Sequence, residues 1–103
     1  MTTPAEYLDQ LQKKLGVHSD NALAKPLGVQ KQTVSRYRLG LTAFDDKVCI
    51  RAAELLCIHP GIVLLHMNVA RTRDPRCKRL WKEVSQGFFK AVPPELDRRR
   101  VPR

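Results

Sequence analysis

Apolar residues recur at helical spacing along most of the chain, and recognisable end signals divide them into short helices. The first helix opens with a Thr-Pro-Ala-Glu capping box at residues 3–6 and stops at Gly16. Ser19 then begins a second, short helix that ends at Gly28. No segment alternates apolar and polar residues with a period of two, so the pattern predicts an all-α chain.

The same kinds of end signal continue down the chain and predict four more helices. The third covers residues 32–39, and the fourth opens with a second capping box, Thr42 to Asp45, and runs to about Cys57. His59-Pro60 opens the fifth helix, and Asp74-Pro75 opens a sixth that Pro93-Pro94 closes. The inward stripe expected for the fourth helix is Phe44, Val48, Ala52, Leu55 and Leu56, and the sixth carries Cys77, Leu80, Trp81, Val84 and Phe88.

Charge is unevenly distributed among the 103 residues, whose formal net charge is +9. Residues 1–70 carry eight basic and six acidic side chains (net +2), and residues 71–103 carry eleven and four (net +7). Between residues 21 and 44 there are basic side chains and no acidic ones. Such a balance favours a polyanionic partner, either nucleic acid or an anionic membrane surface.

The expected organisation is one domain over residues 1–70, a helical extension over 71–92 and a basic, disordered tail over 93–103. The longest apolar run, Gly61–Leu65, is too short to span a bilayer, and the N-terminus lacks a secretion signal. We therefore expect a cytoplasmic protein of a bacterial cell with no membrane partner, located at the nucleoid if its polyanionic partner is DNA.

The segment from Ser19 to Gly40 carries the strongest functional signal. It consists of two helices joined by a short turn that contains Gly28, the arrangement that lays a second helix in the major groove of DNA. Ala24 is small where the helices cross, and Gly28 can adopt a positive φ where the chain reverses. The outer face of the second helix offers Gln30, Lys31, Gln32, Thr33, Ser35 and Arg36.

These outer side chains are of the types that read base edges, because Gln pairs with adenine, Arg or Lys with guanine, and Ser or Thr with either. The plain alternative is a helical hairpin with a solvated basic face. The pattern extends over both helices and the turn, which favours DNA reading.

The segment resembles the helix-turn-helix of the lambda-repressor/Cro-like family, whose usual pattern is LAxxLGVSxxTVSRYxxG. The residues in register are Leu23, Ala24, Leu27, Gly28, Val29, Thr33, Val34, Ser35, Arg36, Tyr37 and Gly40. The likeness extends over roughly residues 5–67 and implies a five-helix domain, here with an additional C-terminal helix. The whole chain is similar to small phage-encoded regulators of this type.

The resemblance implies roles for particular side chains. Those that would contact bases are Lys31, Gln32, Ser35 and Arg36. Those that would lie near phosphates are Ser19, Gln30, Thr33, Arg38 and Thr42. Two residues depart from the family pattern: Asp20 stands where the family usually has a phosphate-binding Gln, and Pro26 should tighten the last turn of the first motif helix.

The last two helices carry apolar side chains that are candidates for a dimer contact. Units of this kind commonly bind as dimers at two half-sites, which favours a homodimer on a palindromic operator. The candidate contacts are Leu65, Trp81, Val84 and Phe88. The run Arg98–Arg100 has three interpretations: a solvated tail, a phosphate-binding arm or, less favoured, a minor-groove arm.

No catalytic or cofactor motif is recognisable in the chain. There is no paired-carboxylate site, P-loop or Ser/His/Asp arrangement, and we expect no enzyme activity, cofactor or small-molecule substrate. Cys57, His59 and His66 match no zinc spacing, so we expect no metal. The three cysteines form no CxxC pair and predict no disulfide framework.

The sequence therefore predicts a sequence-specific regulator of transcription that binds duplex DNA, a phage or prophage repressor acting by operator occupancy. The alternative is an antitoxin or accessory interaction protein for which DNA binding is secondary.

Overall fold

The computed structural model describes residues 2–91, with side chains up to residue 88. These residues form six α-helices and one short 3₁₀ helix, with no strand among them, which confirms the all-α prediction. In chain order the elements are α1 (Pro4–Leu15), the 3₁₀ helix η1 (Asn21–Leu23), α2 (Ala24–Leu27), α3 (Lys31–Arg38), α4 (Asp46–Leu56), α5 (Pro60–Arg71) and α6 (Pro75–Ala91).

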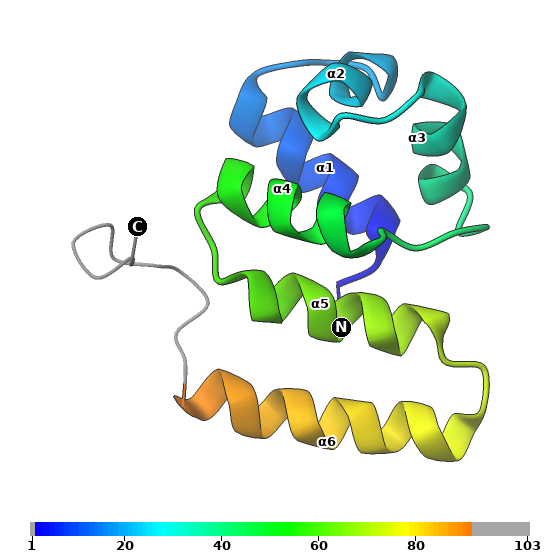
Figure 1. Ribbon diagram of the computed structural model, residues 1–103, viewed down its shortest axis with the longest axis vertical. Coiled ribbons are helices and arrows are strands. Elements are labelled where there is room, and N and C mark those ends of the chain that lie inside the picture. Colours follow the sequence, from blue (N-terminus) through cyan, green and yellow to red (C-terminus); the bar gives the residue numbers. More distant parts are fainter. Residues whose placement is uncertain (1, 92–103) are drawn as a thin grey trace.

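The helices are arranged as a compact group with two further layers on one side (Figure 1). α1 packs against α3 and α4, α5 packs against α4, and α6 lies along the outer side of α5. Over residues 2–91 no helix has both the length and the apolar character that a membrane span requires. The expected tail, including Arg98–Arg100, and the Pro93-Pro94 stop lie outside the described residues.

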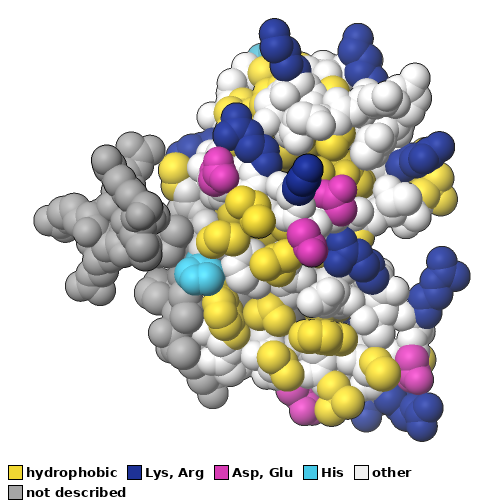
Figure 2. Space-filling view, in the orientation of Figure 1, with side chains coloured by type: hydrophobic (Ala, Val, Ile, Leu, Met, Phe, Trp, Pro, Cys, Tyr) yellow, Lys and Arg dark blue, Asp and Glu magenta, His cyan; other side chains and the backbone are white. Residues whose placement is uncertain are grey.

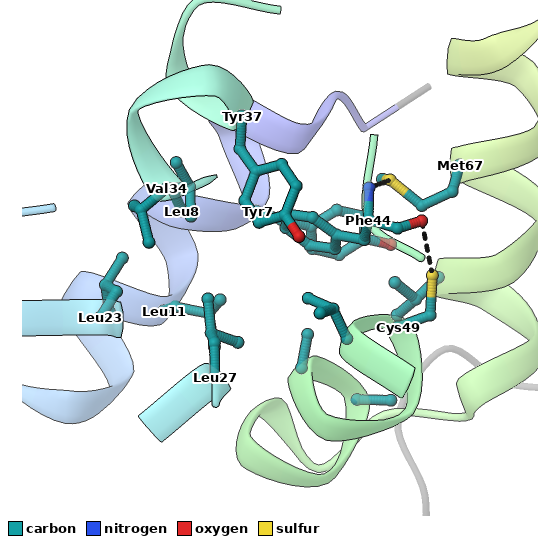
Figure 3. Close-up of a cluster of buried hydrophobic side chains, with 14 of the residues drawn as sticks. Tyr7, Leu8, Leu11, Leu23, Leu27, Val34, Tyr37, Phe44, Cys49 and Met67 are labelled. Atoms are coloured by element: carbon teal, nitrogen blue, oxygen red, sulfur yellow. Dashed lines mark hydrogen bonds between the residues drawn. The ribbon is translucent and has the colours of Figure 1, made fainter. Parts of the chain in front are cut away.

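The hydrophobic core gathers side chains from every element between α1 and α5 (Figure 3). Aromatic rings lie at its centre, where the Tyr37 and Phe44 rings meet edge to face with centroids 4.7 Å apart. None of the described side chains of α6 belongs to this cluster. Its largest fully buried members are Tyr7, Phe44, Leu8, Leu11, Leu23, Met67, Val34, Val63 and Cys49.

Several predicted helix ends are confirmed by their hydrogen bonds. In the first capping box the Glu6 amide donates to Thr3 Oγ1 and the Thr3 amide donates to Glu6 Oε1, each over 3.2 Å. His59 caps α5 through a 2.9 Å bond from the Gly61 amide, and Asp74 accepts a 2.9 Å bond from the Arg76 amide at the start of α6.

The predicted start of the fourth helix is wrong. Asp45 caps α4 instead of Thr42, and its Oδ1 accepts from the Val48 amide over 2.9 Å. The physical reason is tertiary, because the fully buried Phe44 donates its amide to Met67 Sδ over 3.3 Å (Figure 3). The stripe also differs from the prediction: Cys49 and Ala53 are buried, while Leu55 and Leu56 pack only at the edge of the core.

The single helix predicted between Ser19 and Gly28 is wrong in part, since η1 precedes only one turn of α-helix. Pro26 has no N–H to bond the carbonyl of Ala22, so a regular helix cannot run through this position. Ser19 Oγ nevertheless accepts from the Ala22 amide over 3.3 Å, and Gly28 has the expected positive φ of 71°.

Candidate nucleic-acid interface

α3 is held to the protein by one buried face. Val34 and Tyr37 are 0% and 3% exposed, respectively, and the Tyr37 ring packs on Phe44. Burial raises the pKa of the Tyr37 hydroxyl to about 12, so this side chain stays neutral and acts as an anchor. The orientation of α3 is therefore determined by the core, and its remaining surface opposite Val34 and Tyr37 faces solvent.

The four predicted base-contacting residues lie on that remaining surface, and all of them are exposed: Lys31, Gln32, Ser35 and Arg36. At about 100° per residue, they occupy one arc of about 140° around the helix axis. The structure thus brings together two amine or guanidinium donors, an amide and a hydroxyl on one side of a short helix. This set can donate to and accept from base edges.

Four of the five predicted phosphate-contacting residues lie at the start of α3 or in the loops that flank the motif, and Arg38, at the end of α3, is the exception. Gln30 is the exposed N-cap of α3, its backbone is extended, and its side chain makes no capping bond. Thr33 is half-buried, while Ser19 and Thr42 are exposed in the loops on either side of the motif. As in any α-helix, the first backbone amides of α3 have no carbonyl one turn earlier in the helix to bond, and such amides can bind an anion.

The exception is Arg38, which is engaged inside the protein. Its Nε and Nη2 donate to Asp20 Oδ2 and Oδ1 over 2.9 and 2.8 Å. Its Nη1 donates to Asp9 Oδ1 over 2.7 Å and to the Ala5 carbonyl over 3.3 Å. Gln12 also donates to Asp20 over 2.7 Å, so this cluster connects α1, the residue before η1 and the end of α3.

The sequence pattern did not predict this ion-pair cluster. Asp20 stood out only as a departure from the family pattern, and nothing in the local pattern pairs it with a residue 18 positions away. The hydrogen bonds from Arg38 lower the pKa of Asp20, and the two carboxylates raise the pKa of Arg38. The Arg38 guanidinium thereby offsets part of the negative charge of Asp20 and Asp9.

Basic side chains surround the motif. In Figure 2 dark-blue Lys and Arg side chains project from the upper and right-hand parts of the molecule, where α2 and α3 lie. Lys25, Lys31 and Arg36 are exposed, and the chain has no acidic residue between positions 21 and 44. The exposed face of α3 therefore lies in a locally positive field.

The candidate dimer contacts lie away from this surface, on α5 and α6. Val84 is 55% exposed, whereas Leu65, Trp81 and Phe88 are half-buried. The Phe88 ring meets the His59 ring edge to face with centroids 5.4 Å apart. Phe88 thus contributes to the contact between α6 and α5.

The histidines and cysteines are dispersed. Within residues 2–91 no three His, Cys, Asp or Glu side chains are grouped as metal ligands would be. Cys49 lies in the core, where burial raises its pKa to about 11, and His66 Nδ1 bonds the Tyr7 hydroxyl over 2.5 Å.

Comparison with known proteins gives one informative similarity. The chain is 31% identical over 88 residues to the uncharacterized protein Gp-c of Pseudoalteromonas phage PM2. The matched region covers 81% of this chain and 95% of that protein. No protein-family model and no solved structure matches the chain.

Proposed function

We propose that this chain, which belongs to the family of protein Gp-c of Pseudoalteromonas phage PM2, binds duplex DNA through α3 and regulates transcription. One observation carries the proposal: a short helix buries one face and presents Lys31, Gln32, Ser35 and Arg36 together on the other. Nothing in the packing of the domain requires these side chains to be of base-reading types, so their chemistry points to a ligand.

The proposed mechanism is binding without covalent chemistry. Lys31 and Arg36 suit guanine O6 and N7, Gln32 suits adenine N6 and N7, and Ser35 can accept or donate. Ser19, Gln30, Thr33 and Thr42 are assigned in this proposal to the DNA backbone, where such contacts would set the register of α3 on the duplex. Arg38 positions α3 through Asp20 in this proposal, in place of the phosphate contact that the resemblance implies.

The resemblance to the lambda-repressor/Cro-like family supports a repressor that occupies an operator. Eight residues of recognition helix read only a few base pairs, so a second copy on a palindromic site would supply the discrimination that a genome requires. The phage origin of Gp-c is compatible with a phage or prophage repressor.

Selection of bound sequences from a random pool of duplexes tests the proposal. We expect enrichment of a short palindrome by the full chain, because two copies of α3 would read related half-sites. Arg36→Ala should abolish or alter the enriched motif, and Arg79→Ala, which removes an exposed arginine of α6, should not. Failure of the full chain to enrich any sequence would overturn specific DNA binding and favour the interaction-protein alternative.

A further inference from the structure

α6 carries an apolar stripe that the rest of the described protein leaves exposed. Leu80 and Val84 are 58% and 55% exposed, and Cys77 is exposed beside them. Together with Trp81 these residues line a shallow cavity of about 250 Å³. Figure 2 shows hydrophobic side chains gathered over the lower part of the molecule, where α5 and α6 lie.

The apolar stripe is adjacent to the face of α6 that packs on α5. Ser85 is fully buried and Phe88 meets His59, so this side of the helix is the one that contacts the domain. Leu80 and Val84 are turned by about 100° or more from Ser85 around the helix. α6 therefore has more apolar surface than α5 covers, and such a continuous patch usually marks an interface.

Charges beside the stripe indicate what covers it. Glu83 is the one acidic residue of Pro75–Ala91, and it lies on the same flank of the stripe as Arg76. These residues are about 10 Å apart along the helix, too far for an ion pair within it. Glu83 makes no ion pair with the described side chains of residues 2–88, although Arg79 lies one turn away. The Arg76 side chain is 88% exposed although it contacts Asp74.

We infer that α6 of a second copy docks antiparallel on this stripe, with two reciprocal Arg76–Glu83 ion pairs along its edge. In an antiparallel pair related by a twofold axis, residues whose numbers have the same sum face each other. Pairing Arg76 with Glu83 of the second copy places the axis beside Leu80, in the middle of the apolar stripe. In a parallel pair the twofold axis would turn this flank of each helix to opposite sides of the interface, so Arg76 of one copy could not meet Glu83 of the other.

The pairing supplies the second copy that the proposed function requires, and its role in DNA binding rests on that proposal. The interface itself is measured without DNA, so the two can fail separately. A monomeric chain that still enriches a duplex sequence would overturn the pairing alone. A dimer that enriches no sequence would support the pairing and overturn the DNA proposal.

Charge reversal tests the pairing by sedimentation equilibrium of the full chain. Arg76→Glu and Glu83→Arg should each raise the dimer dissociation constant by about tenfold, because each places two like-charge contacts at the interface. The double variant should recover to within about threefold of the wild type, since both pairs are rebuilt with opposite polarity. Lys82→Glu, an equal charge change at an exposed position on the side of α6 opposite the stripe, should leave the constant within about threefold.

Cross-linking tests the position of the axis. In a background with Cys57→Ser and Cys77→Ser, Leu80→Cys should form a disulfide-linked dimer on mild oxidation, because the two sulfurs would meet at the axis. Arg79→Cys, at the same height but turned about 100° away, should not. A wild-type chain that stays monomeric, a double reversal that fails to recover, or cross-linking at position 79 but not at 80 would overturn the inference.

Discussion

Gln32 lies between Ser35 and Arg36 around the exposed face of α3, which makes it the most direct test of base reading. Gln32→Ala should weaken binding to the selected sequence by about 1–3 kcal/mol and relax preference at one or two base pairs. Competition binding against the selected and random duplexes measures this. As a control, Gln86→Ala removes the side-chain amide of an exposed glutamine on α6. If Gln32→Ala lowered the affinity for both duplexes equally, the role given to Gln32 would be contradicted.

The Arg38–Asp20 pair makes a different prediction at the residue scale, for stability. Asp20→Asn should lower the free energy of unfolding by about 1 kcal/mol at pH 7, because it removes one charge of a half-buried bidentate pair. Arg38→Gln should cost a similar amount, and the double variant should cost less than the sum. Additive losses in denaturant unfolding would show that the two side chains are not coupled.

The pH dependence of this pair follows from the lowered pKa of Asp20 in the folded protein. A carboxyl with a lowered folded pKa stabilises the protein fully above its unfolded pKa of about 4. The stabilisation is lost as the pH falls through the folded pKa. The difference between wild type and Asp20→Asn should therefore be constant near neutrality and shrink only in acid.

His66 is buried and gives the chain a second pH dependence. Burial lowers its pKa to about 4 in the folded protein, while the unfolded chain takes up this proton near pH 6.5. The free energy of unfolding is thus not reduced by His66 above pH 6.5. It should fall by up to about 1.4 kcal/mol per pH unit between pH 6.5 and 4. His66→Gln should flatten this slope, whereas Tyr7→Phe, which keeps the buried imidazole, should retain most of it.

At the scale of the helix-turn-helix element, Gly28 allows the reversal between α2 and α3. Its φ is +71°, and a Cβ at this position would have no neighbour within 4 Å, so any cost of a side chain is backbone strain. Gly28→Ala should therefore lower the free energy of unfolding by about 1 kcal/mol. Gly87→Ala should instead raise it by up to about 1 kcal/mol, since Gly87 lies in regular helix with the same free space. If thermal unfolding showed that both variants change the free energy of unfolding in the same direction, this explanation would be contradicted.

The helix boundaries also show where the local sequence pattern was sufficient to predict the structure. The Thr3 capping box, the His59 cap and the glycine stop at residue 16 depend on neighbours within a few positions, and they were predicted from the sequence. The start of α4 was not, because the amide of Phe44 bonds Met67, a residue 23 positions away. A capping pattern at Thr42 was overridden by a contact that exists only in the packed core.

At the scale of the whole molecule, the basic C-terminal third makes a prediction that is independent of the motif. Removing residues 97–103 deletes four arginines and one aspartate, so fewer counterions would be released when the chain binds DNA. The slope of log affinity against log salt should become shallower, and the preferred sequence should stay the same. A changed preferred sequence in the duplex selection would indicate a minor-groove arm instead.

The sequence by itself determined the helical class, most helix ends and the set of polar side chains on α3. These features depend on residues three or four positions apart, which the chain brings together whatever the tertiary fold. The candidate base-contacting residues could be chosen for this reason, and all four are exposed in the structure.

Only the tertiary structure decided how α3 is held and which apolar surface is left uncovered. Arg38 forms ion pairs with Asp9 and Asp20, which lie 29 and 18 positions earlier in the chain. The sequence pattern around Arg38 gives no sign of either partner. On α6 the periodicity marks one continuous apolar face, and α5 covers only part of it. Periodicity can identify an apolar face, but the amount of it that is buried depends on the size and position of the neighbouring helix.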